Sequence, residues 1–459
     1  MSNFNLRRSA VWSVAEVATS GIALFFLYKY VVAILGLHAL GVWSLVLATT
    51  SLARLGDLGA AAGLSRFVAS ALADKEKANA RDFVETALFT NLAIYAAATL
   101  ALAAPLWIGI SLLVPSDSVA EARLLLPYAL VSFALLNANA VLISGLIGAQ
   151  RADLKSKISM ISVAIQLTSV VALVPSFGLI GLGLGQIAQY LFSIVISWLC
   201  LRTALGKEVV SWLPRRFNWP SFHQLFHFGI KLQLANLISF SFEPATKFVI
   251  SAVCGLEMLG IFEMAFRLIL QARHLVVAPM QALLPAFAHL NRENSKELAG
   301  LYEQALAKSV LLAGPVLLSA GILSPIVSSF WLGSYNQNFV AFAGLLSVGW
   351  LINALGTPAY HLGVARGLVR WNIVGHVITS VCGPLFGYFF GQLLGPIALV
   401  SCISVGLALG AITSMLLNCH ASSVSAFTSI DAVANSFKTE FRTMARIVQA
   451  QLRFVLPRT

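Results

Sequence analysis

The chain is a succession of apolar runs, each about 20 residues long or longer, separated by short polar connections. A run of this length crosses the ~30 Å hydrocarbon core of a bilayer as an α-helix. Most of the runs are apolar all round and lack the polar face that a helix of a soluble protein turns to water. The pattern predicts an all-α integral membrane protein with about twelve transmembrane helices. The expected spans are roughly 10–35, 39–64, 83–113, 122–148, 156–176, 178–202, 222–250, 257–288, 306–331, 338–364, 369–391 and 396–419.

Lysine and arginine divide the connections between these spans into two alternating sets. The basic set comprises the N-terminus and the connections around 66–82, 150–157, 202–216, 289–297 and 366–370. The other set holds no lysine or arginine and lies around 36–39, 114–121, 177, 251–256, 332–337 and 392–396. Because basic connections stay in the cytoplasm, both termini are expected there, as an even number of spans requires. The first run is too long for a cleaved signal peptide and is expected to act as a signal-anchor.

An internal repeat relates the two halves of the chain. Residues 36–43 (GLHALGVW) recur without gaps as residues 255–262 (GLEMLGIF). At the same offset Arg54 meets Arg273, Gly148 meets Gly367, and Arg151 meets Arg370. Each copy holds six spans, so both copies cross the membrane in the same orientation. The repeat therefore predicts two six-helix lobes related by a pseudo-twofold axis along the membrane normal.

Polar segments give the boundaries of these lobes. Proline and basic residues interrupt the apolar pattern after the sixth span, and a basic segment follows the twelfth. In that segment apolar residues recur at helical steps beside basic ones, which predicts an amphipathic helix on the cytoplasmic leaflet; a disordered basic tail is the alternative. The expected parts are an N-terminal lobe (1–203), a cytoplasmic linker (204–221), a C-terminal lobe (222–420) and the tail (421–459).

Composition supports the membrane class and excludes several others. Hydrophobic residues make up 58% of the chain and charged residues only 10%, against roughly 25% charged in soluble domains. The net charge of +12 lies largely in cytoplasmic connections and the tail, where it faces anionic lipid, so nucleic acid is not an expected partner. The five cysteines have no paired spacing, and neither a metal nor a cofactor is expected.

Charged residues inside the spans are concentrated in the first two helices of each lobe. A charge at the centre of a bilayer costs about 2.5–3.5 kcal/mol on insertion scales, so its presence there needs a reason. The sequence therefore predicts that these four helices line one polar cavity between the lobes. The charged residues are Glu16 and Lys29 (span 1), Arg54 and Asp57 (span 2), Lys231, Glu243 and Lys247 (span 7), and Glu263, Arg267 and Arg273 (span 8).

Two interpretations of these charges stay open. In the first, residues three or four apart on one helix neutralise each other. The pairs would be Arg54–Asp57, Glu243–Lys247 and Glu263–Arg267. This pairing leaves Glu16, Lys29, Lys231 and Arg273, and Glu16 is expected beside Lys231 or Arg273 or as a proton site.

In the second interpretation the cations bind an anionic headgroup. Arginine suits this role because its planar fork donates two parallel hydrogen bonds to phosphate or carboxylate and stays protonated. The acidic residues Glu16, Asp57, Glu243 and Glu263 would then serve as charge partners or in ion coupling. The candidate headgroup ligands are Arg54, Arg273, Arg267, Lys231, Lys247 and Lys29.

Several short motifs resemble a known family. Gly36-Leu37 with Leu40-Gly41-Val42-Trp43, Asp57-Leu58-Gly59 and Ser65-Arg66-Phe67-Val68 look like the start of Wzx-type polysaccharide and O-antigen flippases. The second copy, Gly255-Leu256 with Leu259-Gly260-Ile261-Phe262, fits the same pattern, and the resemblance covers all twelve spans. These flippases form the polysaccharide transporter family of the multidrug/oligosaccharidyl-lipid/polysaccharide flippase superfamily.

The resemblance implies a function and a mechanism. It implies a V-shaped transporter that moves undecaprenyl-(pyro)phosphate-linked oligosaccharides across the bacterial inner membrane, with polysaccharide polymerase and export machinery as partners. Alternating access of a cationic cavity is the expected mechanism, with Pro244 as a candidate hinge. The lipid II flippases of the superfamily have two further spans, for which this chain has no obvious room before its tail.

Two other classes of function remain. An ion-coupled multidrug exporter would share the fold and could use Glu16 or Asp57 for coupling. A membrane-embedded polymerase or ligase of lipid-linked glycans would need polar groups on a sizeable external loop, and the external connections here are short. No nucleophile–base pair or phosphate-cradling glycine loop stands out, so a transporter is expected rather than an enzyme.

Overall fold

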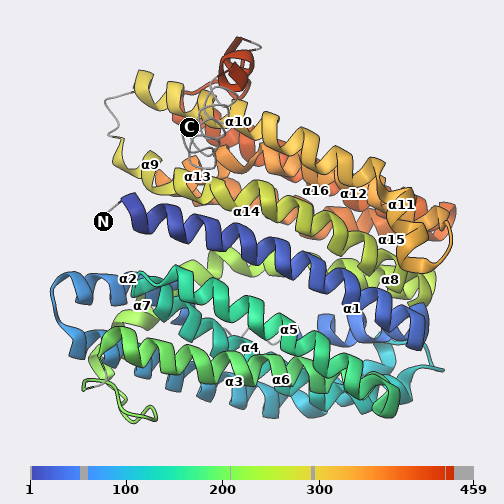
Figure 1. Cartoon of the computed structure of the whole chain (residues 1–459). Coiled ribbons are helices and arrows are strands. Elements are labelled where there is room, and N and C mark those ends of the chain that lie inside the picture. Colours follow the sequence, from blue (N-terminus) through green and yellow to red (C-terminus); the bar gives the residue numbers. More distant parts are fainter. Residues whose placement is uncertain (1–2, 52–59, 207, 291–294, 430, 439–459) are drawn as a thin grey trace, which may run out of the picture. The chain divides into compact units, whose positions relative to one another are not determined.

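Helices make up the whole of the regular structure in the computed structural model, which describes residues 3–51, 60–206, 208–290, 295–429 and 431–438 (Figure 1). The all-α class is confirmed. The elements are α1 (Asn3–Ser51), α2 (Ala60–Ala73), α3 (Lys77–Leu113), α4 (Val119–Gly148), α5 (Ala152–Phe177), α6 (Leu179–Leu205), α7 (Trp219–Phe240), α8 (Phe242–Val277), η2 (Ala278–Ala282), α9 (Leu283–His289), α10 (Ser295–Ile322), α11 (Ser324–Leu332), α12 (Gln337–Leu355), α13 (Thr357–Ala365), α14 (Val369–Val377), η3 (Ile378–Cys382), α15 (Gly383–Leu394) and α16 (Pro396–Ser422).

Ten helical stretches of the described chain are long and apolar enough to cross a membrane. Two of them, Ala15–Ser51 and Ile238–Met280, each overlap two spans that the sequence predicts. Each is interrupted by a non-helical glycine, Gly36 (φ 82°, ψ 172°) in α1 and Gly255 (φ 82°, ψ 175°) in α8. The ten stretches thus account for all twelve predicted apolar runs, while the number of membrane crossings stays a prediction.

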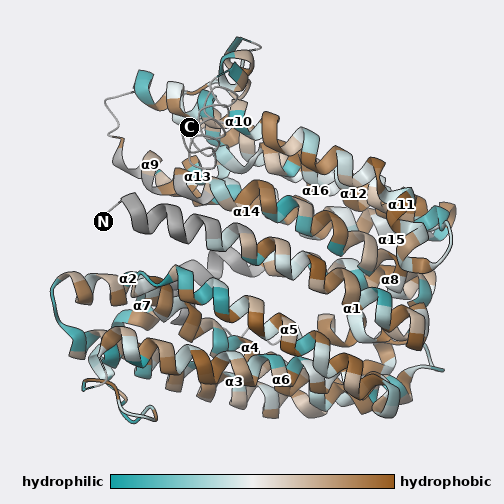
Figure 2. Cartoon of the chain, in the orientation of Figure 1, coloured by the Kyte–Doolittle hydropathy of each residue, from teal (hydrophilic) through white to brown (hydrophobic). Residues whose placement is uncertain are grey.

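Apolar side chains cover the outside of the helices. On α3, Leu100 is 78% exposed, Ile108 69% and Leu112 88%. Figure 2 shows hydrophobic residues along most of the length of α3 and α6, and hydrophilic residues in the connection between α2 and α3. Such a surface would be unfavourable in water and is suited to lipid, as expected of a multi-pass membrane protein.

The repeat extends through the backbone of both halves. Eight of the ten described residues with positive φ form four matched pairs, at helix ends or at breaks within a helix: Gly36 with Gly255, Gln150 with Gly367, Gly178 with Gly395, and Gly206 with Ser423. The last three pairs share one separation along the chain, which is slightly shorter than that of the first pair. The second copy is therefore two residues shorter than the first between its first and second matched positions.

This shift corrects two pairings made at the constant offset. Gly367 corresponds to Gln150 rather than Gly148, because both close a helix with the same hydrogen bonds. The Arg151 N–H donates to the Leu146 carbonyl at 2.9 Å, and the N–H of Leu368 donates to the Gly363 carbonyl at 2.7 Å. Arg151 therefore corresponds to Leu368, and Arg370 is not its counterpart.

Contacts between Cα atoms group the chain into two compact units. The first contains Met1–Met264, Ile326–Phe339 and Gly387–Leu399, and the second contains Ala265–Pro325, Val340–Phe386 and Val400–Thr459. In the first unit α4 packs against α3, α6 and α1, and α5 packs against α1 and α6 (Figure 1). In the second unit α13 packs against α9, α10 and α14. The division into lobes 1–203 and 222–420 stays a prediction.

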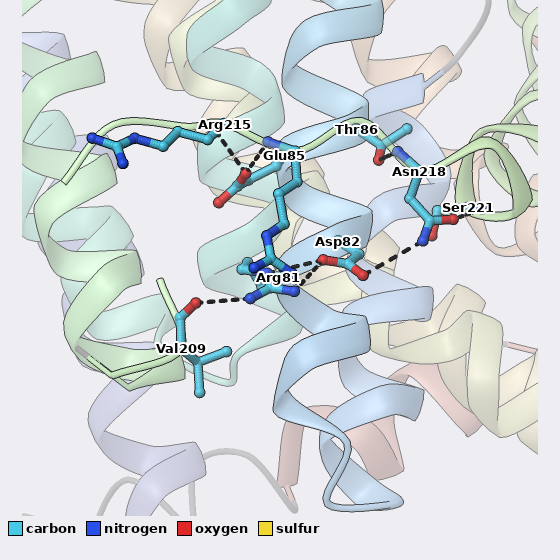
Figure 3. Close-up of polar contacts among 9 residues, drawn as sticks. Arg81, Asp82, Glu85, Thr86, Val209, Arg215, Asn218 and Ser221 are labelled. Atoms are coloured by element: carbon cyan, nitrogen blue, oxygen red, sulfur yellow. Dashed lines mark hydrogen bonds and ion pairs between the residues drawn. The ribbon is translucent and has the colours of Figure 1, made fainter. Parts of the chain in front are cut away.

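The connection between α6 and α7 is fastened to the start of α3 (Figure 3). The carboxylate of Glu85, which is 1% exposed, accepts the backbone N–H groups of Arg215 at 2.8 Å and Arg216 at 2.6 Å. Arg81 donates to the carbonyl oxygen of Val209 at 3.0 Å. Where the structure describes it, the expected linker is therefore an ordered segment whose backbone N–H groups are hydrogen-bonded to side chains of α3.

The start of the C-terminal tail contacts the second unit. Ser429 donates from its N–H and its hydroxyl to Glu303 Oε1 of α10, at 3.3 and 2.9 Å. Residues 431–438 are helical. The remainder of the expected amphipathic helix, 439–459, lies outside the described residues.

Candidate functional site

Two glycines from the two copies of the repeat contact each other's motifs reciprocally within the first unit. Gly41 lies against the backbone carbonyl of Leu256, and its counterpart Gly260 lies against the backbone carbonyl of Leu37. A Cβ atom at either glycine would overlap the opposing oxygen, so only glycine permits this approach. Leu37 and Leu256 are themselves counterparts at the same offset. The contact therefore has the self-complementary form that a twofold relation between two copies produces.

A buried charge cluster of four side chains lies in the same helices α1 and α8. It consists of Tyr28, Ser44, Lys247 and Glu263. Glu263 accepts hydrogen bonds from the hydroxyls of Tyr28 at 3.1 Å and Ser44 at 2.9 Å, and it pairs with Lys247 at 2.9 Å. The side chains of Lys247 and Glu263 are 1% and 4% exposed. Loss of one partner from a charge pair this deeply buried strongly destabilises the protein, because the other charge stays buried without compensation.

The same repeat offset relates the members of this cluster. Tyr28 is the counterpart of Lys247, and Ser44 is the counterpart of Glu263, at the offset that relates the two glycine motifs. The first copy of the repeat thus supplies two neutral hydroxyls where the second supplies an ion pair. Tyr28 and Ser44 carry no charge, so the search for intramembrane charges missed them. Applying the offset to each charged residue would have found both.

Lys247 binds a second carboxylate. Its ammonium lies 2.7 Å from Glu243 Oε1, one helical turn earlier on α8, and the Glu243 side chain is 37% exposed. The local pair expected from the four-residue spacing is therefore present. Glu263, which the same spacing pairs with Arg267, is bound to Lys247 across the break of α8 at Gly255.

Arg273 is held by neutral groups. Its Nε and Nη2 donate to the amide oxygen of Asn353 at 3.3 and 3.1 Å, and its guanidinium carbon lies 4.5 Å from the centre of the Trp350 ring. Trp350 and Asn353 are three residues apart on α12 and therefore share a face of that helix. Within the described chain, no carboxylate lies within ion-pair distance of Arg273. The arginine thus keeps its positive charge uncompensated by a described acidic side chain.

Lys29 in the first unit has a similar environment. Its ammonium lies 3.6 Å from the centre of the Phe330 ring of α11. Trp331 next to it donates from its ring nitrogen to the carbonyl oxygen of Phe25 at 3.0 Å, which fixes α11 on α1. A cation over an aromatic face is stabilised without being neutralised. Lys29 and Arg273 are thus two intramembrane cations held by aromatic rings.

Glu16 pairs with a residue that the sequence places at the membrane surface. Lys155 of α5 lies 2.7 Å from both carboxylate oxygens of Glu16. The sequence predicts Lys231 or Arg273 as the partner of Glu16; the structure shows Lys155, because α1 packs against α5 and the long lysine side chain reaches across.

Other candidate residues are described only in part. The guanidinium carbon of Arg267 lies 5.9 Å from the centre of the adjacent Phe266 ring. Arg54 and Asp57 lie outside the described residues, and for Lys231 only the helical backbone of α7 is described. The predicted Arg54–Asp57 pair therefore stays a prediction.

The chain breaks its helix just before Pro244. α7 ends at Phe240 and α8 begins at Phe242, with Ser241 between them as a turn. Proline in the first turn of a helix is tolerated because the N–H it lacks would have no partner there, and it cannot bond back to the preceding helix. The break is a structural feature, and its use as a hinge stays a prediction.

A metal site would require three or more histidine, cysteine or acidic side chains in one place. The described part of the chain contains no such group. The chemistry that these residues support is electrostatic: binding, orientation and pairing of charged groups inside a membrane.

Comparison with known families identifies the group to which these features belong. Residues 31–341, well over half of the chain, match the model of a family described as polysaccharide biosynthesis protein. The chain belongs to this polysaccharide biosynthesis protein family. The predicted membership of a polysaccharide biosynthesis family is thereby confirmed.

Two curated relatives of this polysaccharide biosynthesis family match part of the chain. The amylovoran biosynthesis protein AmsL of Erwinia amylovora is 25% identical over 175 residues, 37% of this chain and 45% of the relative. A Shigella flexneri protein assigned as an O-antigen transporter is 23% identical over 212 residues, 46% of this chain and 49% of the relative. The matched region spans about half the length of both relatives.

Solved structures confirm the fold of this family member. An inward-facing multidrug transporter of the MATE family superposes with a TM-score of 0.72 at 16% identity, covering 87% of this chain and 94% of its own. The lipid II flippase MurJ in an inward closed conformation gives a TM-score of 0.68 at 14% identity, covering 96% and 93%. At these identities the likeness defines the architecture alone.

Proposed function

We propose that the protein is a flippase that moves a polyprenyl-(pyro)phosphate-linked oligosaccharide from the inner to the outer leaflet of the bacterial cytoplasmic membrane. The carrier is undecaprenyl, and the glycan is delivered to polysaccharide polymerisation and export machinery. Both termini lie in the cytoplasm. Family membership and the distribution of lysine and arginine between the connections support this proposal.

The observation that carries the proposal is the environment of Arg273. Its charge is set in a membrane-spanning helix against an amide oxygen and an indole ring, with no described carboxylate to neutralise it. Burying such a charge is costly, and an anionic ligand recovers that cost. Nε and Nη2 of Arg273 donate to the Asn353 oxygen. Nη1 donates to none of the described residues and is therefore available to donate to a phosphate oxygen.

The reciprocal glycine contact and the buried charge cluster support alternating access. Gly36 and Gly255 mark connections without lysine or arginine, which the positive-inside rule assigns to the non-cytoplasmic side. The contact between α1 and α8 at Gly41 and Gly260 lies near this side. The headgroup would enter from the cytoplasm while the polyprenyl tail stays in lipid. Release on the far side then requires the contact of Gly41 with Leu256, and that of Gly260 with Leu37, to open.

A deletion strain carrying plasmid-borne variants tests this function. Loss of the gene should abolish surface polysaccharide and leave the lipid-linked intermediate on the cytoplasmic leaflet. Arg273→Ala should fail to restore export while reaching the membrane in normal amounts. The matched control is Arg370→Ala, because Arg370 also lies 4.5 Å from a tryptophan ring but at an exposed position beside a basic connection.

Two results would overturn the proposal. Full restoration of surface polysaccharide by Arg273→Ala would remove the headgroup assignment. Unchanged surface polysaccharide in the deletion strain, together with lost resistance to cationic dyes, would instead identify an ion-coupled multidrug exporter.

A further inference from the structure

A cavity of about 260 Å³ lies within the first unit, between α4, α5 and α6. Its polar lining comes from all three helices: Asn139 of α4, Lys155, Ser159 and Ser162 of α5, and Gln189, Tyr190 and Ser193 of α6. Each of these residues belongs to a helix long and apolar enough to span the membrane. A concave site lined by a few convergent polar groups on an apolar background is the usual form of a small-ligand site.

Several of these polar groups have hydrogen-bonding capacity to spare. The hydroxyl of Ser193 donates to the amide oxygen of Asn139 at 2.7 Å, which leaves the Asn139 amino group without a partner among the described residues. The side chains of Ser159 and Gln189 likewise form no hydrogen bond with the described part of the chain. Polar groups at membrane depth are costly when they remain unsatisfied, so this lining favours a polar occupant.

The cavity is close to electrically neutral. Its one cationic side chain, Lys155, is paired through both carboxylate oxygens with Glu16 at 2.7 Å. A phosphate would have to compete with that carboxylate, whereas an uncharged ligand would not. The amides and hydroxyls match the vicinal hydroxyl groups of a sugar ring, and Tyr190 adds to the lining an aromatic side chain, a type suited to pack against the apolar side of a sugar.

We infer that this cavity binds one neutral sugar residue of the transported lipid-linked oligosaccharide and so takes part in selecting the glycan. This inference rests on the proposed flippase function and names a second contact, separate from the cationic headgroup ligands. The volume is below the roughly 300–1,000 Å³ of pockets for drug-sized ligands, so it suits a single ring rather than the whole oligosaccharide. Recognition by hydrogen bonds to hydroxyls would discriminate between sugars, because a missing hydroxyl leaves protein groups unsatisfied.

Direct binding to the purified full chain in lipid nanodiscs tests the inference. The probes are undecaprenyl diphosphate alone and undecaprenyl diphosphate that carries glucose, galactose or N-acetylglucosamine. The wild-type protein should bind at least one glycosylated probe about threefold to tenfold more tightly than the bare lipid, as expected for one or two net hydrogen bonds. Gln189→Leu and Asn139→Leu should each reduce this preference while leaving the affinity for the bare lipid unchanged.

The control is Gln166→Leu on α5, which removes an amide outside the cavity and should keep the sugar preference. Unchanged affinity for the bare lipid also shows that each variant is folded. The inference is overturned if wild type binds all four lipids equally, or if both cavity variants keep the full preference; either result leaves the flippase function standing. Failure of wild type to bind any of the four lipids would overturn the flippase function as well.

Discussion

At the scale of single residues, the environment of Lys247 depends on two acidic partners of different kinds. Glu243 is partly exposed and can take up water or lipid headgroups if the lysine is lost. Glu263 is buried, and it accepts hydrogen bonds from the hydroxyls of Tyr28 and Ser44 in addition to its pairing with Lys247. Removal of Lys247 would leave that carboxylate charged in a low-dielectric environment, which costs far more than the pair itself contributes.

The first copy of the repeat suggests a test of this asymmetry. Lys247→Tyr should destabilise the protein by about 3–5 kcal/mol, because it removes the ammonium that pairs with the buried carboxylate of Glu263. Adding Glu263→Ser reproduces the neutral Tyr28 and Ser44 arrangement of the other copy and should recover more than half of that loss. The thermal unfolding midpoint of the detergent-purified protein gives the comparison. A double variant no more stable than Lys247→Tyr would contradict this account of the cluster.

The residue scale also shows the limit of spacing rules. The Glu243–Lys247 pair follows from helical geometry, since residues four apart share a face. The bond of Glu16 to Lys155 joins helices that are far apart in sequence, and the bond of Lys247 to Glu263 crosses the break of α8 at Gly255. No rule of local spacing predicts either contact. The headgroup interpretation of Arg273 needed the structure as well, because only the structure shows that its described partners are Asn353 and Trp350.

At the scale of elements, the approach of α1 and α8 rests on the absence of two side chains. Gly41 and Gly260 each face a backbone carbonyl, which cannot move aside as a flexible side chain can. Close backbone approach at small residues is a common way for membrane helices to associate, because lipid supplies little hydrophobic drive for helix packing. A single methyl group added at Gly41 or Gly260 should therefore disturb the contact between the two helices.

Alanine substitution within a single helix separates this effect from helix propensity. Gly41→Ala should destabilise the protein by about 1–3 kcal/mol, because the new methyl group overlaps the Leu256 carbonyl. Gly21→Ala, also in α1, meets nothing within 4 Å and should be neutral or stabilising by up to about 1 kcal/mol. Thermal unfolding midpoints of the two variants show whether the loss at Gly41 exceeds the effect of the same substitution at Gly21. Equal effects would mean that backbone entropy, not the contact, governs Gly41.

A second prediction at this scale concerns the connection between α6 and α7. Glu85→Ala should leave the Arg215 and Arg216 N–H groups without their buried acceptor, a cost of about 1–3 kcal/mol per group. The segment should then open more often, so trypsin should cut after these arginines several-fold to more than tenfold faster. Glu76→Ala, at an exposed position beside the same end of α3, is the control. The prediction fails if both variants are cleaved at the wild-type rate.

Sequence periodicity could locate the elements but not all of their boundaries. The apolar runs predicted the long helices, because length and composition alone decide whether a helix can span a bilayer. The break at Gly36 was expected from the polar connection there, whereas the two-residue shift between the copies was invisible in a short motif matched without gaps. The backbone shows it, because Gly178 and Gly395 and two other matched pairs of positive-φ residues share a separation shorter than that of Gly36 and Gly255.

At the scale of the whole molecule, the repeat predicts the membrane topology independently of the distribution of charged residues. If each copy contains an even number of spans, equivalent positions of the two copies lie on the same side of the membrane. If the count were odd, they would lie on opposite sides, as in an inverted repeat. The matched backbone positions, which keep one common separation after the first pair, provide equivalent points throughout the chain.

Reporter fusions at these points test the arrangement. Alkaline phosphatase fused after Gly178 and after Gly395 should be active, because both connections lack lysine and arginine and are expected outside the cytoplasm. Green fluorescent protein fused after Gln150 and after Gly367 should fluoresce, because these basic connections are expected inside. Opposite results within either matched pair would exclude two parallel six-span copies. Agreement within both pairs but with the two reporters exchanged would keep the repeat and invert the orientation, placing Lys29 and the reciprocal glycine contact near the cytoplasmic face.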